Sequence, residues 1–217
     1  MRPKVAIVGV GPGGPAQVTP AAREALRSSE MVVSWDLNLG PVRELVAGKQ
    51  IWLQRPADYR DVAARAARAA FATGAATAVV RIGDPTVSGG LDNLLELYAG
   101  AEVRVVPGIS SVQAAAAVAG IELHRAVVFS FHDEDRRNAE ERDFLLEAHR
   151  RGRHLVVLVG PSMRPADLAQ FLMENGTDPA TPAVVGSRLT LPEERVDRCT
   201  LAEMALREYD WLSVVVV

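Results

Sequence analysis

Residues 4–20 read KVAIVGVGPGGPAQVTP and decide the fold. A β-branched apolar run is followed by a loop rich in glycine and proline. A helix start comes next, because Thr19 is a good N-cap and Pro20 fits the first helical position. This order of strand, glycine-rich turn and helix is typical of a βαβ unit in a parallel sheet. The loop then lies at the carboxyl end of the strand, where open α/β sheets bind ligands.

Apolar β-branched runs alternate with stretches of helical period along the rest of the chain. Residues 57–73 place alanines and Val62 on one side and arginines on the other, which predicts a helix that covers the sheet. Two strands within 182–198 predict a hairpin, so the second sheet is mixed. We therefore predict an α/β protein of two αβα domains, 1–112 with a parallel sheet and 113–217 with a mixed sheet. The expected strands are 4–10, 31–35, 50–53, 77–82, 102–106, 126–130, 154–159, 182–186, 194–198 and 212–217, and the other expected helices include 110–120, 138–150, 164–174 and 200–208.

The composition excludes several classes of protein. The chain has 217 residues, 48% of them hydrophobic, and a net charge of -3, so it can bury a core and has no basic excess typical of nucleic-acid binding. The single cysteine, Cys199, excludes an internal disulfide framework. No segment reaches the roughly 20 apolar residues of a spanning helix, and the histidines lack metal-ligand spacing. We expect a cytoplasmic protein with no metal site that binds neither nucleic acid nor membrane.

The first loop also matches a dinucleotide fingerprint. Gly9, Gly11 and Gly14 satisfy G-x-G-x-x-G after a strand, and Asp36 closes the next strand. A dinucleotide site needs a helix that begins at the third glycine, whereas here two prolines stiffen the loop and the helix begins only at Thr19. A nicotinamide or flavin site therefore stays open as an alternative, as does a turn that binds no ligand.

Two further loops follow strands of the first predicted sheet. Residues 81–90 read RIGDPTVSGG, in which Gly83 permits close backbone approach and Asp84 fixes a turn. Residues 107–111 read PGISS, and their serines can cap the next helix or donate hydrogen bonds to a ligand carboxylate. Each loop by itself is more typical of a plain turn or cap. Because all three loops leave carboxyl ends of strands in one sheet, they can line one crevice.

The order of GVGPGG, P-x-x-x-T-P, GDP and PGISS resembles the tetrapyrrole methylase superfamily, the class III methyltransferases that use S-adenosyl-L-methionine (SAM). The second half resembles the CbiE-type precorrin-6Y or cobalt-precorrin-7 C5-methyltransferase of cobalamin biosynthesis. The segments that carry this likeness are SFH at 130–132, GRHLVVLVGPSMRPADLAQFL at 152–172 and VVGSRLTLPEERV at 184–196. The resemblance covers essentially the whole chain. It implies a homodimer whose two αβα domains form a SAM cleft, a tetrapyrrole (precorrin) acceptor, and S-adenosyl-L-homocysteine as product.

The resemblance also implies roles for individual residues. The loop from Gly9 to Gly13 faces the tetrapyrrole, so Gly11 and Pro12 shape the site of methyl transfer. His132, at the end of a predicted strand, is the candidate acid or base. The residues implied to contact SAM follow predicted strands or begin the next helix: Gly83, Asp84, Val87, Ser110, Ser111, Val159 and Leu189.

Methyl transfer from a sulfonium is an in-line displacement at carbon, so it needs positioning and desolvation rather than a metal or a strong nucleophile. The acceptor carries acetate and propionate carboxylates, which a protein of negative net charge repels unless arginines cluster locally. The candidate arginines lie near predicted strand ends: Arg55, Arg81, Arg125 and Arg188.

The chain departs from the family pattern at Ile82, Val87, Ser187 and Asp133, where serine, an aromatic residue, glutamate and glycine are usual. These differences keep open a SAM-dependent methyltransferase with another acceptor, a different tetrapyrrole or a peptide, and a non-catalytic SAM-binding subunit. In this family, C15 methylation with decarboxylation belongs to a separate domain of another fold. We expect C5 methylation alone, with the C15 activity in a separate subunit or a further fused region.

Overall fold

The computed structural model describes residues 2–132 and 138–217, so Asp133 lies outside the described residues. The chain divides into two compact units, Met1–Ser110 and Ser111–Val217. The division falls where helix α6 (Ser111–Ala119) begins, and Val112 of this helix packs into a core cluster of the second unit.

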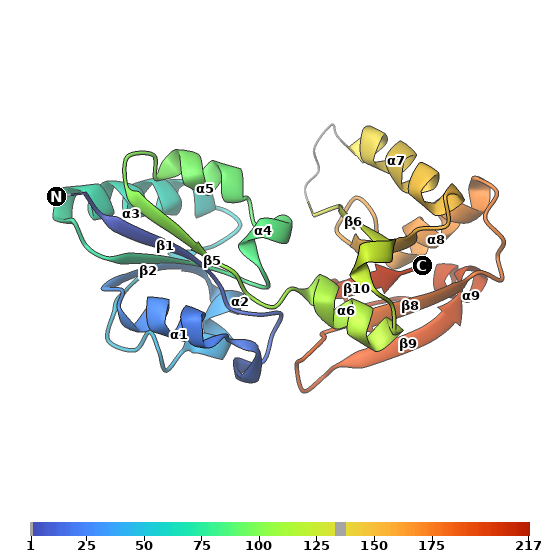
Figure 1. The fold of residues 1–217 in the computed structure, drawn as a ribbon, viewed down its shortest axis with the longest axis horizontal. Coiled ribbons are helices and arrows are strands. Elements are labelled where there is room, and N and C mark those ends of the chain that lie inside the picture. Colours follow the sequence, from blue (N-terminus) through green and yellow to red (C-terminus); the bar gives the residue numbers. More distant parts are fainter. Residues whose placement is uncertain (1, 133–137) are drawn as a thin grey trace. The chain divides into compact units, whose positions relative to one another are not determined.

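A parallel five-stranded sheet in the order β3-β2-β4-β1-β5 forms the centre of the first unit (Figure 1). Its register pairs Gly9 with Arg81 and Val8 with Val106, so β1, β4 and β5 end at one edge. The predicted parallel sheet is confirmed, and the three motif loops leave from this carboxyl edge. The strands are β1 (Lys4–Gly9), β2 (Met31–Trp35), β3 (Gln50–Gln54), β4 (Thr77–Arg81) and β5 (Glu102–Val106).

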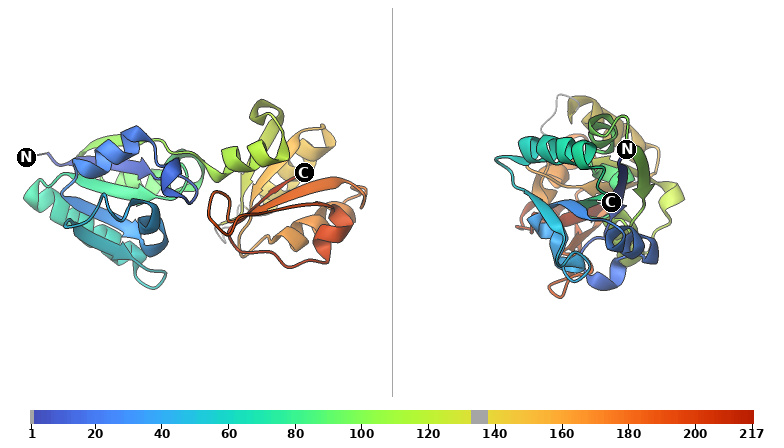
Figure 2. Two further views of the ribbon diagram at one scale, coloured as in Figure 1. Left: turned by 90° about the horizontal axis from the view of Figure 1, so that it is seen from below. Right: turned by 90° about the vertical axis from the view of Figure 1, so that its left-hand side faces the viewer.

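Helices cover both faces of this sheet (Figure 1, Figure 2). α1 (Pro20–Arg27) buries Leu26 on one face, and its N-cap is the predicted Thr19, whose side chain accepts a hydrogen bond from a backbone N–H. On the other face α3 (Tyr59–Thr73) buries Val62 and three alanines, as its pattern predicts. The shorter helices are α2 (Asp36–Leu39), α4 (Pro85–Ser88) and α5 (Leu91–Leu97), with 3-10 turns at Pro15–Gln17 and Gly40–Val42.

The second unit has a mixed sheet in the order β6-β7-β10-β8-β9, in which β6 and β7 are parallel and the other pairs antiparallel. The predicted hairpin is therefore confirmed as β8 and β9. α6 covers one face of the sheet, and α7, α8 and α9 contribute to the core on the other. The elements are β6 (Ala126–Ser130), β7 (His154–Leu158), β8 (Pro182–Ser187), β9 (Arg195–Thr200), β10 (Ser213–Val216), α7 (Asn138–Arg150), α8 (Pro165–Glu174), α9 (Leu201–Ala205) and a 3-10 turn at Leu123–Arg125.

The last helix is shorter than the expected 200–208. α9 ends at Ala205, where the backbone tightens into i to i-3 hydrogen bonds. Arg207 and Tyr209 then both reach back to Asp197 of β9. These side-chain contacts join the segment after α9 to β9, and this segment is not helical although the sequence pattern predicts a helix to residue 208.

Three motif glycines pack backbone against backbone at the carboxyl edge of the first sheet. A Cβ atom added to Gly108 would lie 2.2 Å from the carbonyl oxygen of Gly83, and one added to Gly9 would lie 2.6 Å from the same oxygen. Gly83 also exchanges two backbone hydrogen bonds with Gly11, of 3.3 and 2.8 Å, and both residues have positive φ. We call Gly9, Gly11, Gly83 and Gly108 the glycine junction. It leaves no room for side chains between the three loops.

We predict that Gly108→Ala lowers the free energy of unfolding of the first unit by about 1–3 kcal/mol, because the added methyl overpacks against backbone that cannot rotate away. Gly40→Ala is the control, since its φ is -46° and, apart from its chain neighbours, nothing lies within 4 Å of its added Cβ. Its expected effect is within about 0.5 kcal/mol. Urea denaturation measures both, and equal midpoints would contradict the overpacking.

Candidate functional site

The segment after β4 combines a backbone cradle with exposed apolar side chains. Gly83 is buried, whereas Ile82 and Val87 are each 38% exposed. Asp84 is the N-cap of α4, and its Oδ1 accepts hydrogen bonds from the backbone N–H of Thr86 at 2.8 Å and from the Thr86 hydroxyl at 2.7 Å. The carboxylate therefore has a structural task, with Oδ2 left for a ligand. Backbone, carboxylate and apolar side chains together suit a ligand with polar and apolar parts.

Arg81 holds this segment rather than facing an acceptor. Its Nε donates to the carbonyl oxygen of Gly89 at 3.1 Å, and its Nη1 donates to the Val80 carbonyl at 3.0 Å and to Oε1 of Gln54 at 3.4 Å. Burial lowers the pKa of Arg81 and raises that of the nearby Tyr98 to about 12. The guanidinium thus ties the end of α4 to the ends of β3 and β4.

The remaining predicted residues of the first three loops have different environments. Gly11 and Pro12 are buried, and Gly11 is joined to Gly83 as described above. Ser110 is buried at the end of the first unit, and Ser111 begins α6. α1 starts at Pro20 rather than at Gly14, so the helix terminus that a dinucleotide site requires is absent from this loop.

In the second unit the predicted residues follow one edge of the sheet. The register aligns Ser130, Leu158 and Gly186 across β6, β7 and β8, through Val214 of β10. His132, after β6, has an exposed side chain. Val159 and Leu189, after β7 and β8, have buried side chains in separate core clusters. These two residues therefore present their backbone, not their side chains, at the edge.

A strained segment after β8 is held by an ion pair that the sequence analysis missed. Arg188 and Thr190 have φ of 50° and 69°, a region that costs non-glycine residues of order 1–3 kcal/mol. Arg188 Nε donates to Oδ2 of Asp210 at 2.7 Å, and its backbone N–H donates to the Leu212 carbonyl at 2.9 Å. Nothing in the sequence indicates this pairing, because the two charged residues are distant along the chain and meet only through the sheet.

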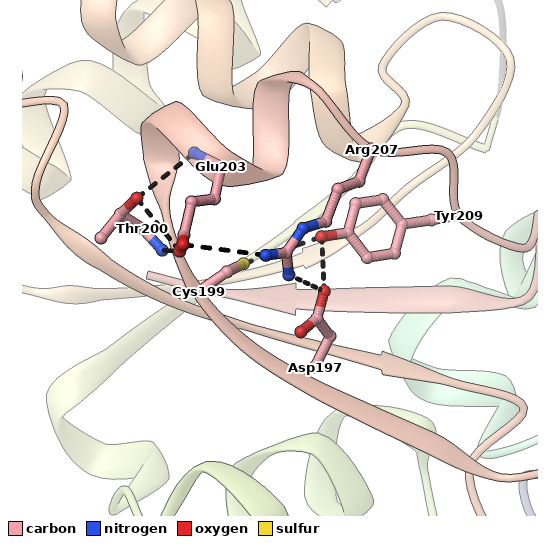
Figure 3. Close-up of polar contacts among 6 residues, drawn as sticks. All are labelled: Asp197, Cys199, Thr200, Glu203, Arg207 and Tyr209. Atoms are coloured by element: carbon pink, nitrogen blue, oxygen red, sulfur yellow. Dashed lines mark hydrogen bonds and ion pairs between the residues drawn. The ribbon is translucent and has the colours of Figure 1, made fainter.

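A second polar cluster lies on the α9 side of the sheet (Figure 3). Asp197 accepts hydrogen bonds from Nη1 of Arg207 at 2.7 Å and from the Tyr209 hydroxyl at 2.9 Å. The Tyr209 hydroxyl also contacts Sγ of Cys199 at 3.7 Å, and burial raises the pKa of this thiol. Both this cluster and the Arg188 ion pair line a cavity of about 810 Å³, in which acidic side chains balance the arginines. The cavity is therefore no anion site.

The described residues contain neither a cluster of metal ligands nor a helix that could span a membrane. In residues 2–132 and 138–217, no three His, Cys, Asp or Glu side chains gather in a way that could hold a metal ion. In the same residues, every helix is too short or too polar to cross a membrane.

The Arg188 ion pair predicts a pH dependence. The backbone N–H of Leu212 and the Arg188 guanidinium hold the pKa of Asp210 below its usual range, against the effect of burial. Ionised Asp210 therefore stabilises the fold above its unfolded pKa of about 3.9, and this stabilisation disappears as the pH falls through the lower folded-state pKa.

We expect Asp210→Asn to lower the free energy of unfolding by about 1 kcal/mol at neutral pH, and by progressively less on acidification. Urea unfolding over a range of pH measures this difference. Asp143→Asn, at an exposed position of α7, is the control and should have little effect throughout. A loss of stability in Asp210→Asn that is the same in acid as at neutral pH would refute the role of the ionised carboxylate.

Comparison with known proteins shows to which family this chain belongs. The sequence profile of Tetrapyrrole (Corrin/Porphyrin) Methylases matches residues 4–205. The chloroplastic S-adenosyl-L-methionine-dependent uroporphyrinogen III methyltransferase of Arabidopsis thaliana is 33% identical over 215 residues, covering 93% of this chain and 58% of that protein. The probable cobalt-precorrin-7 C(5)-methyltransferase of Methanocaldococcus jannaschii is 33% identical over 140 residues, covering 64% and 63%.

A solved structure shares the fold. The uroporphyrin-III C-methyl transferase from Thermus thermophilus, complexed with S-adenyl homocysteine, superposes with a TM-score of 0.75 at 25% identity, covering 98% of this chain and 91% of that one. The chain spans about half the length of the first curated relatives that it matches. The profile match over most of the chain confirms the resemblance read from the motifs: this chain belongs to the tetrapyrrole (corrin/porphyrin) methylase family.

Proposed function

We propose that this chain is a SAM-dependent C-methyltransferase that methylates C5 of a precorrin or cobalt-precorrin. The observation that carries the proposal is the glycine junction, a cradle free of side chains at the carboxyl edge of the first sheet, in a member of this family. The choice of C5 is supported by the second-half motifs and by the similarity to the Methanocaldococcus protein. In this proposal the chain acts as a homodimer, and a separate subunit or region carries out C15 methylation with decarboxylation.

The residues present fit SAM. The backbones of Gly9, Gly83 and Gly108 pack together without side chains between them, and in this proposal the backbone groups of the three loops face the cofactor. Ile82 and Val87 offer exposed apolar contact, and Asp84 Oδ2 can accept hydrogen bonds from the cofactor. When bound, SAM supplies an electrophilic methyl group. The residues of the chain then position the acceptor and exclude water. The exposed His132 is the candidate that moves a proton.

A second acceptor, uroporphyrinogen III, is favoured by one finding. The Arabidopsis enzyme is 33% identical over 93% of this chain, a longer match than that of the Methanocaldococcus protein. Both acceptors are tetrapyrroles, so the two proposals share the cofactor and differ in the ring that is methylated.

Anaerobic incubation with methyl-labelled SAM distinguishes these acceptors. The chain would be offered precorrin intermediates with and without cobalt, and separately uroporphyrinogen III, with products analysed by mass spectrometry. We expect one labelled methyl, mapped to C5 of the corrin ring. Label on uroporphyrinogen III alone would establish the second candidate. Binding of S-adenosylhomocysteine without transfer to either would indicate a non-catalytic subunit or another acceptor.

Two substitutions of Asp84 separate its cap from its proposed contact with SAM. Asp84→Asn keeps a side chain that caps helices as well as aspartate, so stability should change by less than about 0.5 kcal/mol. It removes a charged acceptor, so affinity for S-adenosylhomocysteine should fall about tenfold in calorimetry. Asp84→Ala should lose about 1 kcal/mol of stability as well. Wild-type affinity in Asp84→Asn would leave Asp84 as a cap alone.

A further inference from the structure

The strand-end arginines are not equally available to an acceptor. Arg125 precedes β6, so it lies at the amino end of that strand, away from the edge that His132 follows. Arg81 and Arg188 are engaged, with carbonyl oxygens and with Asp210 respectively. Arg55 differs, because it directly follows the carboxyl end of β3 and is exposed, and its guanidinium makes no hydrogen bond or ion pair with the described part of the chain.

A rigid turn holds Arg55 in place. Its backbone N–H donates to Oδ1 of Asp58 at 3.0 Å, and its carbonyl oxygen accepts from the Asp58 N–H at 3.1 Å. Gln54, which is only 2% exposed, donates from Nε2 to the Tyr59 carbonyl at 3.0 Å and so joins the end of β3 to the start of α3. The Arg55 guanidinium therefore extends from a backbone turn that these hydrogen bonds hold in place.

An aromatic pair lies beside this turn. Trp35 ends β2 in register with Gln54, and its ring lies 5.4 Å from that of Tyr59, which is 37% exposed. The Arg60 guanidinium lies 5.5 Å from the Tyr59 ring centroid, and its Nε donates to the Tyr59 hydroxyl at 2.9 Å. The surface beside the Arg55 turn thus combines two aromatic side chains with the Arg60 guanidinium.

The sheet register fixes the distance from this pair to the glycine junction. β2 pairs with β4 and β4 with β1, which places Val33, Val79 and Ile7 in one row across the sheet. Trp35 and Gly9 each lie two residues beyond this row, toward the carboxyl edge. Two strand spacings separate Trp35 from Gly9, on the order of 10 Å. This is comparable to the breadth of a tetrapyrrole macrocycle, so one ring system can reach from the junction to the aromatic pair.

We propose that Trp35, Tyr59 and Arg55 form a subsite for the acceptor, which we call the Arg55 subsite. The conjugated ring packs against the aromatic pair, and one of its carboxylates pairs with the Arg55 guanidinium, with Arg60 beside it. The neighbouring Asp61 is paired with Arg65 at 3.1 Å, and Asp58 accepts its hydrogen bond from the Arg55 backbone N–H, not from the Arg55 guanidinium. This inference rests on the proposed function, since it assumes a tetrapyrrole acceptor.

Binding of two stable porphyrins to the full chain tests the carboxylate contact. Uroporphyrin III carries acetate and propionate groups, whereas coproporphyrin III has methyl groups in place of the acetates. With S-adenosylhomocysteine present, Arg55→Gln should bind uroporphyrin III about tenfold more weakly and discriminate less between the two porphyrins. Arg55→Lys should recover part of the affinity. Arg68→Gln, the same change at an exposed position further along α3, is the control and should stay within about twofold of wild type.

The aromatic contact has its own test. Tyr59→Leu should weaken binding of both porphyrins about fivefold, whereas Tyr59→Phe, which keeps the ring, should bind nearly as wild type. Affinity for S-adenosylhomocysteine should be unchanged in every variant. Wild-type porphyrin binding in Arg55→Gln, or an equal loss of S-adenosylhomocysteine affinity, would overturn the subsite and leave the proposed function standing. A wild-type chain that binds S-adenosylhomocysteine but neither porphyrin would overturn the tetrapyrrole acceptor and the subsite together.

Discussion

Contact between the backbones of Gly9, Gly83 and Gly108 is the constraint on which the carboxyl edge of the first sheet depends. Parallel strands bring their carboxyl ends to one edge, but side chains there would normally hold the following loops apart. Three glycines remove that spacing, so the loops after β1, β4 and β5 meet as one surface. We propose that a ligand at this edge is held in part by backbone groups, which cost little conformational entropy to order because the fold has already fixed them.

The second unit orders its edge by different means. After β8 the chain adopts positive φ at Arg188 and Thr190 without glycine, and the strain is offset by an ion pair and by backbone hydrogen bonds. One edge therefore relies on the absence of side chains and the other on a charged side chain. The stability that comes from glycine packing does not change with pH, whereas the stability that comes from the Arg188–Asp210 ion pair does.

Arginine has three distinct uses in this chain. Arg81 is half-buried and bonds to carbonyl oxygens, so it maintains a loop. Arg188 and Arg207 are paired with aspartates. Within residues 2–132 and 138–217, Arg55 is the strand-end candidate that combines an exposed, unpaired guanidinium with a place at a carboxyl edge. The net charge of the chain is negative. Binding of an acceptor that bears carboxylates therefore depends on where an unpaired arginine lies and not on the overall composition.

Much of the fold could be predicted because its signals are local. The apolar run of residues 4–10 became β1 (Lys4–Gly9), and the Thr19 cap and the alanine face of 57–73 marked α1 and α3 closely. The early end of α9 was not predicted, because Arg207 and Tyr209 contact Asp197 of β9, a partner that the sequence pattern of the helix does not contain. The length of an element thus depends on partners that its own sequence does not contain.

The same division holds for the functional site. The sequence pointed to the glycines, to Asp84 and to the serines after β5 as candidates, because turns and helix caps need particular residue types at fixed positions. The sequence did not predict which arginine is buried and which is paired, because burial and pairing depend on contacts between strands far apart in the chain. Local patterns therefore predict the two sheets, the loops at their edges and the family. Contacts between distant residues make Arg81 the support of a loop and, within the described residues, leave the Arg55 guanidinium without a partner on the turn next to Tyr59, because such contacts form only when the strands come together.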